Sequence, residues 1–280
     1  MVAWGWNGVG QLGDGTEVNR HIPVRVMDDV VAVSTGTYHT TAIQSDGSLW
    51  VWGCNVHSQL GVSVYDDANI RRHEPVHIMD NMTHVVAGRY HTMAIDEDDI
   101  LWGWGNNENK QLWGISLPRR QFTPVPLIYD VLAVSVGRTR TIAIQSDNRL
   151  FIWGQHWIEP QEYSQSAVVS ISRPTHAINH VAAVSTGRWH TAIIRTDGSL
   201  WTWGGNYVGQ LGDGTTTGRL HPAQIMDDVM AVSVSPWHTM AVQADGSLWV
   251  WGGNRFGQLG DGTTIDRHYP VKIMDNVMLP

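Results

Sequence analysis

Residues 36–53 read Gly-Thr-Tyr-His-Thr-Thr-Ala-Ile-Gln-Ser-Asp-Gly-Ser-Leu-Trp-Val-Trp-Gly, and close copies of this stretch recur along the chain. The anchor of each copy is the tryptophan of a Trp-Gly pair, and these tryptophans are Trp4, Trp52, Trp104, Trp153, Trp203 and Trp251. They stand 48, 52, 49, 50 and 48 residues apart. A period near 50 residues is the length of a whole supersecondary unit, so the chain is a repeat protein.

The copy at 36–53 predicts three short strands. An apolar run at 30–34 precedes Gly36, a second apolar strand follows at 39–43, and a third carries the paired tryptophans at 49–52. Between the second and third strands stands Asp46-Gly47. This pair predicts a hairpin, because a tight turn needs residues that tolerate a positive φ.

A fourth strand follows a polar, glycine-rich loop in each repeat. Its form is Pro-Val-x-Ile-Met or a close variant, seen at 23–27, 75–79 and 270–274. Four short strands per repeat, without helical periodicity, are typical of β-propeller blades. The predicted fold class is therefore all-β, a β-propeller of four-stranded repeats of about 50 residues, with five complete repeats and a partial sixth.

Three recurring phrases carry a family resemblance. Gly-x-x-His-Thr-x-Ala-Ile, Asp-Gly-Ser-Leu-Trp-x-Trp-Gly-x-Asn and Gly-Gln-Leu-Gly-Asp-Gly-Thr together resemble the repeat of the regulator of chromosome condensation family, over nearly the whole chain. The resemblance implies a propeller, usually seven-bladed, that serves mostly as a platform for protein partners. It does not identify the partner, because one fold hosts many functions.

We predict one β-propeller domain over residues 1–280. Its repeats span about 1–29 (partial), 30–80, 81–130, 131–179, 180–228 and 229–280. Seven full repeats would need roughly 350 residues. A smaller closed ring, an arc completed by another chain and a truncated gene remain open. Because an open arc would expose strand edges, we favour a five- or six-bladed ring, or a truncated open one.

Composition excludes several classes of protein. A net charge of −8 argues against non-specific binding to nucleic acid. Apolar runs fall far short of the roughly 20 residues that cross a bilayer, so no membrane contact is expected. The single cysteine, Cys54, excludes an internal disulfide and a cysteine-rich zinc site. With no signal peptide visible, we expect a cytoplasmic protein if the chain is complete.

Residues that return in every repeat are expected to be structural. Paired tryptophans such as Trp50 and Trp52 lie two apart, face the same side of a strand and should pack between sheets. Histidine recurs at one position, at His39, His91, His190 and His238, with Arg140 in its place in the third repeat. Since these residues lie on different blades, they cannot share one metal ion, and hydrogen-bonded structural histidines are expected.

The polar loops and turns favour no cofactor. The Gly-Asp-Gly-Thr loops at 13–16, 212–215 and 260–263 lack the Gly-Lys-Ser/Thr ending of a phosphate loop and the spaced carboxylates of a calcium loop. The acidic stretch 96–99 is expected to be a solvated turn. No small-molecule ligand, metal or cofactor is therefore expected.

The two residues between glycine and histidine vary between repeats. They read Thr37-Tyr38, Arg89-Tyr90, Arg138-Thr139, Arg188-Trp189 and Pro236-Trp237. All occupy one strand connection, and aromatic and arginine side chains at exposed turns have the composition of binding hot spots. The predicted partner-binding residues are Tyr38, Arg89, Tyr90, Arg138, Arg188, Trp189 and Trp237. The alternative is that they cap the central channel or pack on the neighbouring loop.

Two further resemblances concern these turns. Aromatic residues at the second position are similar to those of the propeller-type β-lactamase inhibitors. The plant ultraviolet-B photoreceptors of the family place tryptophan before arginine, whereas the order here is Arg188-Trp189, so we do not favour photoreception. The altered loop at 155–163 has two open interpretations, a second contact patch or drift in a tolerant loop.

The function predicted from the sequence is a non-enzymatic propeller that binds a protein through an aromatic and arginine face. No nucleophile elbow, His-Glu-x-x-His helix or reactive cysteine setting is visible, so no catalytic residue is predicted. The alternatives are a guanine nucleotide exchange factor for a small GTPase, as implied by the family resemblance, and a carbohydrate-binding propeller.

Overall fold

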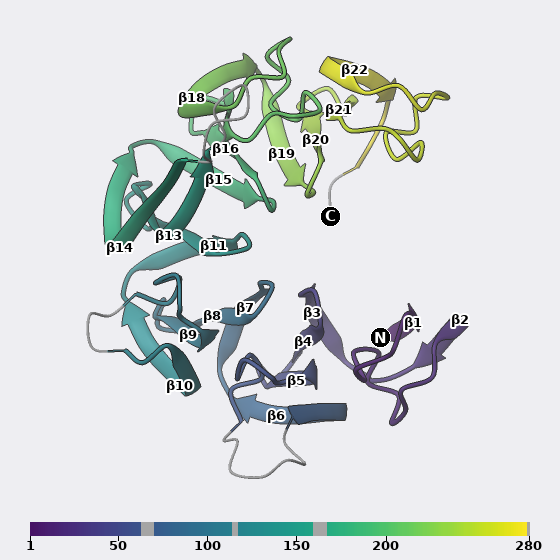
Figure 1. Cartoon of the computed structure of the whole chain (residues 1–280), viewed down its shortest axis with the longest axis vertical. Helices are drawn as coiled ribbons and strands as arrows, with labels where there is room; N and C mark the ends of the chain where they lie inside the picture. Colours follow the sequence, from purple (N-terminus) through teal and green to yellow (C-terminus); the bar gives the residue numbers. More distant parts are fainter. Residues whose placement is uncertain (63–69, 114–116, 159–166, 279–280) are drawn as a thin grey trace. The chain divides into compact units, whose positions relative to one another are not determined.

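A computed structural model describes the chain except for residues 63–69, 114–116, 159–166 and 279–280, and it leaves the side chains at 156–158 and 167–169 undescribed. The described residues form one two-stranded and five four-stranded sheets (Figure 1). The all-β fold class is confirmed. Most of the altered loop at 155–163 lies outside the described residues.

The strands follow the predicted repeats. The two-stranded sheet pairs β1 (Val2–Gly5) with β2 (Arg20–Arg25). The four-stranded sheets are β3 (Val30–Thr35), β4 (His39–Gln44), β5 (Leu49–Cys54) and β6 (Arg71–Met79); β7 (Met82–Ala87), β8 (His91–Asp96), β9 (Leu101–Asn106) and β10 (Arg120–Ile128); β11 (Val131–Val136), β12 (Arg140–Gln145), β13 (Leu150–Ile158) and β14 (Ala167–Ile178); β15 (Val181–Thr186), β16 (His190–Arg195), β17 (Leu200–Gly204) and β18 (Arg219–Met226); β19 (Val229–Val234), β20 (His238–Gln243), β21 (Leu248–Gly252) and β22 (Arg267–Met274).

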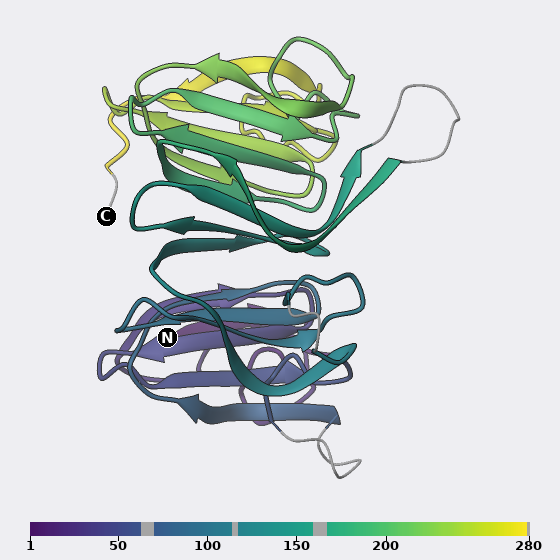
Figure 2. The same ribbon diagram turned by 90° about the vertical axis from the view of Figure 1, so that its left-hand side faces the viewer.

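Two compact units divide the chain. Unit 1 consists of Met1–Thr141 with Ser172–Pro174, and unit 2 consists of Ile142–Ile171 with Thr175–Pro280. Inside unit 1 the strands β3 and β7 lie side by side, and the outer strands β6 and β10 lie at the far ends of their sheets (Figure 1). Figure 2 shows the strands of unit 1, coloured purple to blue, from the side.

Each unit has a core between its sheets. The core of unit 1 contains Ile43, Leu49, Val51, Leu60, Met82, Val85, Ala94 and Trp104. That of unit 2 contains Ala192, Ile194, Leu200, Val229, Ala241 and Trp251. The tryptophan that precedes glycine in the third strand is buried in every four-stranded sheet, at Trp52, Trp104, Trp153, Trp203 and Trp251. The prediction of packing between sheets is confirmed for these residues. The first tryptophans of the pairs are only half-buried, at Trp50, Trp102, Trp201 and Trp249.

The Asp-Gly turns form as predicted, but only the glycine adopts a positive φ. Gly47 has φ +82°, and its N–H donates to the carbonyl of Gln44 at 3.0 Å. The Asp46 carboxylate instead accepts hydrogen bonds from the backbone and hydroxyl of Ser48, at 2.9 and 2.6 Å. Aspartate therefore stabilises the turn through its side chain, while glycine supplies the left-handed backbone.

The acidic turn of the second complete repeat differs from expectation. Asp96 is buried rather than solvated, and its carboxylate accepts hydrogen bonds from the indole of Trp102 at 2.7 Å and from the backbone of Ile100 at 2.9 Å. The other three acidic residues are exposed. Asp96 is buried because it ends strand β8, so its side chain takes the place that the turn serine fills in other repeats.

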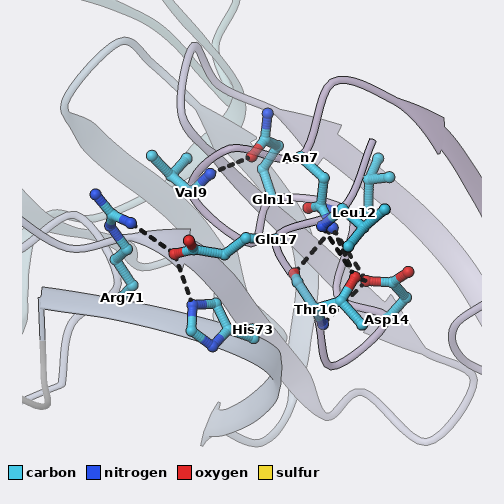
Figure 3. A network of polar contacts seen from close by, with 10 residues as sticks. Asn7, Val9, Gln11, Leu12, Asp14, Thr16, Glu17, Arg71 and His73 are labelled. Carbon is cyan, nitrogen blue, oxygen red and sulfur yellow. Dashed lines mark hydrogen bonds and ion pairs between the residues drawn. The ribbon is translucent and has the colours of Figure 1, made fainter. Parts of the chain in front are cut away.

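The polar loops hold their shape through their own side chains (Figure 3). In the first loop the Asn7 amide donates to Asp14 at 3.0 Å, and Asp14 accepts from Thr16 at 2.8 Å and from Arg20 at 2.5 Å. The same four residue types make the same network at Asn206, Asp213, Thr215 and Arg219, and at Asn254, Asp261, Thr263 and Arg267. The Gly-Asp-Gly-Thr phrase is thus a structural loop.

Each loop also connects one sheet to the next. The Gln11 carbonyl accepts hydrogen bonds from the hydroxyl of Thr40 at 2.8 Å and from the indole of Trp52 at 2.9 Å. Gln59 and Gln210 repeat this double contact with the corresponding threonine and tryptophan of the following repeat. The loop therefore sets how neighbouring sheets of one unit pack.

Two further findings concern the whole described chain. Among the residues described, no helix is long and apolar enough to span a bilayer. The same residues include no group of three or more His, Cys, Asp or Glu side chains placed to hold a metal ion.

Candidate functional site: aromatic clusters at the strand turns

The five turns between glycine and histidine share one backbone geometry. In each turn the first residue donates its N–H to the carbonyl three positions later, at 2.8–3.0 Å, and these residues are Gly36, Gly88, Gly137, Gly187 and Ser235. The two residues enclosed by this bond form the tip of the turn. The variable residues singled out from the sequence therefore occupy equivalent positions.

The backbone carbonyl of the second tip residue is held by a hydrogen bond from the end of the third strand or the residue that follows it. The carbonyl of Tyr38 accepts the N–H of Cys54 at 2.8 Å, and that of Trp237 accepts the N–H of Gly253 at 2.8 Å. Glycine is required just before the donor, because a Cβ on Gly53 or Gly252 would lie 2.6 or 2.5 Å from the tip carbonyl. The tip backbone is therefore held rigidly while its side chain is free to vary.

Neighbouring turns of one unit lie in contact. A Cβ on Gly36 would lie 2.3 Å from the carbonyl of Gly88, which leaves room only for glycine. Behind this contact, Nε2 of His39 lies 2.9 Å from the hydroxyl of Thr92 in the next sheet. His190 and Thr239 repeat the pair in unit 2 at 2.8 Å. The predicted structural role of these two histidines is confirmed.

In unit 1 the turns assemble a tyrosine cluster, which we define as Trp6, Tyr38, His57, Arg89 and Tyr90. Tyr38 and Tyr90 are stacked, with ring centroids 5.9 Å apart and planes 14° apart. Trp6 meets Tyr38 edge to face at 6.4 Å, and His57 lies 4.2 Å from Tyr90. The Arg89 guanidinium lies over the Tyr90 ring at 4.8 Å. Three successive repeats therefore present one continuous aromatic surface bearing a cation.

In unit 2 the equivalent turns assemble a tryptophan cluster, defined as Arg188, Trp189 and Trp237. The two indoles lie 6.1 Å apart with planes at 45°. Arg188 is exposed, and its guanidinium lies over Trp189 at 4.6 Å. Trp237 is 41% exposed. Each cluster thus combines aromatic area with an arginine that retains free donors above a ring.

Arg138 occupies the first tip position of the third turn and is half-buried. Its neighbour is Thr139, so this turn contributes no aromatic ring. The following residue, Arg140, stands where other repeats have histidine and is buried. Burial lowers the pKa of Arg140 to about 10, so it stays charged at neutral pH.

Two members of the tyrosine cluster, Trp6 and His57, were not predicted from the sequence. Trp6 takes the position held by Cys54, Asn106, Gln155, Gly205 and Gly253 in the other repeats. His57 takes the position of Val9, Asn109, Val208 and Phe256. The signal for Trp6 is that no other repeat has a ring at its position. His57 offers no such signal, because Phe256 is also a ring.

Buried imidazoles in unit 1 are kept neutral. Burial lowers the pKa of His39 to about 3 and that of His91 to about 4. The pKa of His57 is lowered by burial and by the positive charge of Arg120 and Arg89, with Glu108 opposing. Positive charge at the tyrosine cluster therefore comes from arginine near neutral pH.

Comparison with known proteins identifies the architecture. The family model of the RCC1-like domain matches residues 1–278. Human WBSCR16 has a crystal structure that superposes with a TM-score of 0.83 at 21% identity, covering 98% of this chain and 76% of that one. The Prp20p structure from Saccharomyces cerevisiae superposes with a TM-score of 0.67 at 17% identity, covering 98% of this chain and 85% of that one. The predicted β-propeller fold is confirmed.

Curated relatives match over shorter segments. The Arabidopsis thaliana ultraviolet-B receptor UVR8 is 30% identical over 116 residues, which is 40% of this chain and 26% of the receptor. The Xenopus laevis regulator of chromosome condensation is 28% identical over 125 residues, which is 43% of this chain and 30% of that protein. The matches therefore span less than a third of the length of either relative.

Proposed function

The chain belongs to the RCC1-like domain family of β-propellers, and we propose that it is a non-enzymatic binding domain whose aromatic clusters at the strand turns engage a protein partner. One observation carries the proposal: in each unit two neighbouring turns bring their aromatic rings to about 6 Å from one another and place an arginine over a ring, on turns closed by the same backbone hydrogen bond. Repeat proteins present extended binding surfaces on a scaffold that is nearly the same in every repeat. In this chain the side chains at the turn tips vary from one repeat to the next.

The chemistry of the clusters defines the partner surface. Aromatic rings supply large apolar contact area with little loss of side-chain entropy, and arginine supplies forked donors to carboxylates or carbonyls. Arg89 and Arg188 are the donors, one in each cluster. We therefore expect a partner segment with apolar side chains beside acidic ones.

A protein with a similar structure binds other proteins. One crystal structure shows Kap60 bound to yeast RCC1 (Prp20), and the Prp20p study concerns binding to Gsp1p and histones. These statements belong to Prp20, which shares only the fold with this chain. They support protein binding as a use of this scaffold.

The test is affinity capture from the source organism's lysate with matched variants. Wild type is compared with the double variants Trp189→Ala/Trp237→Ala and Tyr38→Ala/Tyr90→Ala, and captured proteins are identified by mass spectrometry. The matched control is Arg255→Ala/Phe256→Ala, because this arginine also lies over its neighbour's ring, at 5.8 Å, but outside the turns. Circular dichroism confirms that each variant is folded.

We expect at least one protein to be lost with a cluster variant and retained with the control. The purified pair should then bind in titration calorimetry, with the cluster substitution weakening affinity at least about 30-fold, or 2 kcal/mol, as for hot-spot residues. Equal capture by wild type and both cluster variants would exclude the clusters as the binding site.

Nucleotide exchange on a small GTPase is the second candidate, supported by the similarity to the regulator of chromosome condensation. It makes a different prediction, namely faster release of labelled GDP from a purified GTPase. Unchanged GDP release across a panel of GTPases would exclude nucleotide exchange on those GTPases. Together with a captured partner, that result would favour non-enzymatic protein binding as the function.

A further inference from the structure

Unit 2 contains a cavity of about 430 Å³ between two neighbouring sheets. The end of β14 and the connection that follows it form one wall, and β16, β17 and β18 form the other. Sites for small molecules have volumes of about 300–1,000 Å³. The cavity is therefore large enough for a small ligand, and its lining includes His176, His180, Ile193, Arg195, Trp201 and Pro222.

The cavity lies away from the tryptophan cluster. Strand β16 begins at His190, directly after the turn tip with Arg188 and Trp189, and it ends at Arg195 in the cavity wall. An extended strand of this length separates its two ends by roughly 17 Å. An inference about the cavity is therefore independent of the proposed function.

Arg195 stands where other repeats have a residue that bonds to the preceding connection. The equivalent residues are Gln44, Asp96, Gln145 and Gln243. The amide of Gln44 donates to the Asp28 carbonyl at 2.9 Å, and its Oε1 accepts from the hydroxyl of Ser48 at 3.1 Å. Gln243 repeats both contacts. A guanidinium has no acceptor for a serine hydroxyl, and that of Arg195 lies instead over the Trp201 ring at 5.0 Å.

The donors of the Arg195 guanidinium are free. Within the described part of the chain this half-buried side chain has neither a hydrogen-bond acceptor nor an ion pair. Hydrogen bonds from Ser199, at 2.6 and 3.0 Å, are the main cause of the lowered pKa of Asp197, and the charge of Arg195 lowers that pKa further. The N–H groups of Arg195 are therefore available to an acceptor in the cavity.

The connection before β15 lacks the acidic residues of the other connections. It reads Asn179-His180. The others read Asp28-Asp29, Asp80-Asn81, Tyr129-Asp130, Asp227-Asp228 and Asp275-Asn276. The second residue has a positive φ in all six connections, between 55° and 62°, so the positions are equivalent. Each of the other connections carries at least one carboxylate, and this one carries none.

His176 has an uncharged partner where its equivalent has an acidic one. In the first complete repeat the equivalent residue is His77. Nε2 of His77 lies 2.8 Å from the Asp80 carboxylate, whereas Nε2 of His176 lies 2.9 Å from the amide oxygen of Asn179. The lining of the cavity thus combines one guanidinium and two imidazoles without a carboxylate, in a chain with a net charge of −8.

We infer that this cavity binds a small monocarboxylic acid, with the carboxylate on Arg195 and an apolar body against Trp201 and Pro222. The two oxygens of a carboxylate match two parallel N–H groups of a guanidinium. His176 and His180 add ring nitrogens that can donate to the same oxygens.

The charge of the cavity favours a monoanion. Arg195 is the only arginine or lysine in the lining, and the exposed carboxylate of Asp197 lies near enough to interact with it. A phosphate monoester carries a charge of about −1.5 to −2 at neutral pH. It would therefore bring more negative charge than one guanidinium balances, whereas a carboxylate brings a single charge.

The apolar lining specifies the rest of the ligand. Ile193 is buried, and Trp201 and Pro222 are half-buried in the cavity wall. Apolar atoms that cover these side chains gain free energy in proportion to the area that leaves water. An aromatic ring can in addition pack beside the Trp201 indole and the guanidinium over it. An aromatic monocarboxylate is therefore the form expected to bind best.

The test uses the full 280-residue chain and para-fluorobenzoate as the probe, with binding followed by fluorine NMR. Further probes separate the parts of the ligand. Para-fluorobenzamide has the ring without the charge, acetate, added as a competitor, has the carboxylate without the ring, and para-fluorophenyl phosphate has the larger charge. The site is identified from the indole N–H signal of Trp201 in a nitrogen–proton correlation spectrum, assigned with the variant Trp201→Phe.

Two variants introduce residues that other repeats already have at these positions, so both should fold. Arg195→Gln removes the guanidinium, and His180→Asp adds a carboxylate. The matched control is Arg255→Gln, because Arg255 also lies over its neighbour's ring, at 5.8 Å, but outside the cavity. Circular dichroism confirms that each variant is folded.

We expect saturable binding of para-fluorobenzoate, with a dissociation constant of about 1 mM or lower and a shift of the Trp201 signal. Arg195→Gln should weaken binding at least about 10-fold, because a charge-assisted pair is lost. His180→Asp should weaken it at least about 5-fold by repulsion. Arg255→Gln should leave the affinity unchanged.

The other probes should bind less well. Para-fluorobenzamide and acetate should each bind at least about 10-fold more weakly than para-fluorobenzoate, and the phosphate should bind no more tightly. No saturation below about 10 mM, or equal affinity of wild type and Arg195→Gln for para-fluorobenzoate, would overturn the inference. Equal weakening by Arg255→Gln, or tighter binding of the phosphate, would overturn it as well. The capture experiment uses variants at the turn tips, so its outcome is separate from this one.

Discussion

The tyrosine cluster of unit 1 and the tryptophan cluster of unit 2 lie on equivalent turns closed by the same backbone hydrogen bond, but they carry different aromatic side chains in different ring geometries. Tyr38 and Tyr90 stack at 14°, whereas Trp189 and Trp237 meet at 45°. The tyrosine cluster also recruits Trp6 and His57 from polar loops. The contrast shows that the scaffold and the contact surface of this protein are separable, since one is repeated and the other is not.

The largest expected effect tests whether the two scaffolds are equivalent. Trp104→Ala in unit 1 and Trp251→Ala in unit 2 each remove a fully buried indole and should each lower the free energy of unfolding by about 3–5 kcal/mol. Guanidinium unfolding followed by circular dichroism measures this. Trp4→Ala, at the exposed equivalent position, should cost about 0.5 kcal/mol or less. A loss confined to one unit would contradict a shared scaffold.

Acid should destabilise unit 1 through its two buried histidines. The pKa values of His39 and His91, about 3 and 4 in the folded protein, lie below the value of 6.5 expected when unfolded, so the unfolded chain binds more protons. Their stabilisation is present above about pH 6.5 and is lost as the pH falls towards 4, by about 1.4 kcal/mol per histidine per pH unit.

Hydrogen exchange as a function of pH checks this expectation. Protection of β4 and β8 should fall before that of β12, which carries Arg140 at the position of the histidine. Simultaneous loss in all three strands would show that the buried histidines do not set the acid limit.

A smaller effect tests how rigidly the tips are held. Gly105→Ala and Gly252→Ala place a Cβ 2.6 and 2.5 Å from the carbonyls of Tyr90 and Trp237, at φ values of +99° and +103°. Each substitution should cost about 1–3 kcal/mol in denaturant unfolding, because a non-glycine residue is strained there. Gly257→Ala is a control for the positive φ alone, since nothing but the Thr263 carbonyl at 3.8 Å lies near its Cβ. An equal cost at all three sites would remove the close approach as the cause.

The smallest effect compares the two ring pairs directly. A double-mutant cycle on Tyr38 and Tyr90, each changed to Ala, is measured on the free energy of unfolding. Ring stacking should give a coupling energy of about 0.5–1.5 kcal/mol. The same cycle on Trp189 and Trp237 should give a coupling in the same range, despite the 45° angle, because both pairs lie at about 6 Å. Zero coupling in one cluster would mean that its two rings do not stabilise each other.

The sequence predicted the strands well because their pattern is local. Strands β4 and β5 lie where the alternation around Asp46-Gly47 placed them, and the turn forms, although Asp46 contributes through its carboxylate rather than through its φ. The fourth strands begin earlier than the Pro-Val phrase suggested, at Arg20, Arg71 and Arg267. An arginine in a polar stretch does not by itself predict a strand. Each of these arginines is in a strand because it pairs with the end of the tryptophan strand that precedes the polar loop.

The candidate site was predicted only in part. Its tip residues follow from internal variation between repeats, which the sequence displays. The entry of Trp6 and His57 into the tyrosine cluster and the burial of Asp96 do not follow, because each depends on which side chain of another segment lies opposite.

The repeat, the strands, the turns and the apolar side of each strand follow from the amino-acid sequence, because a period of 50 residues and alternation within strands are visible without any long-range contact. Which of those apolar sides are covered follows only from the packing of the sheets in three dimensions. Trp4 and Trp52 occupy equivalent positions of two successive repeats, yet one is exposed and the other buried. The physical reason is that burial is a property of the neighbouring sheet, and identical residues differ when their neighbours do.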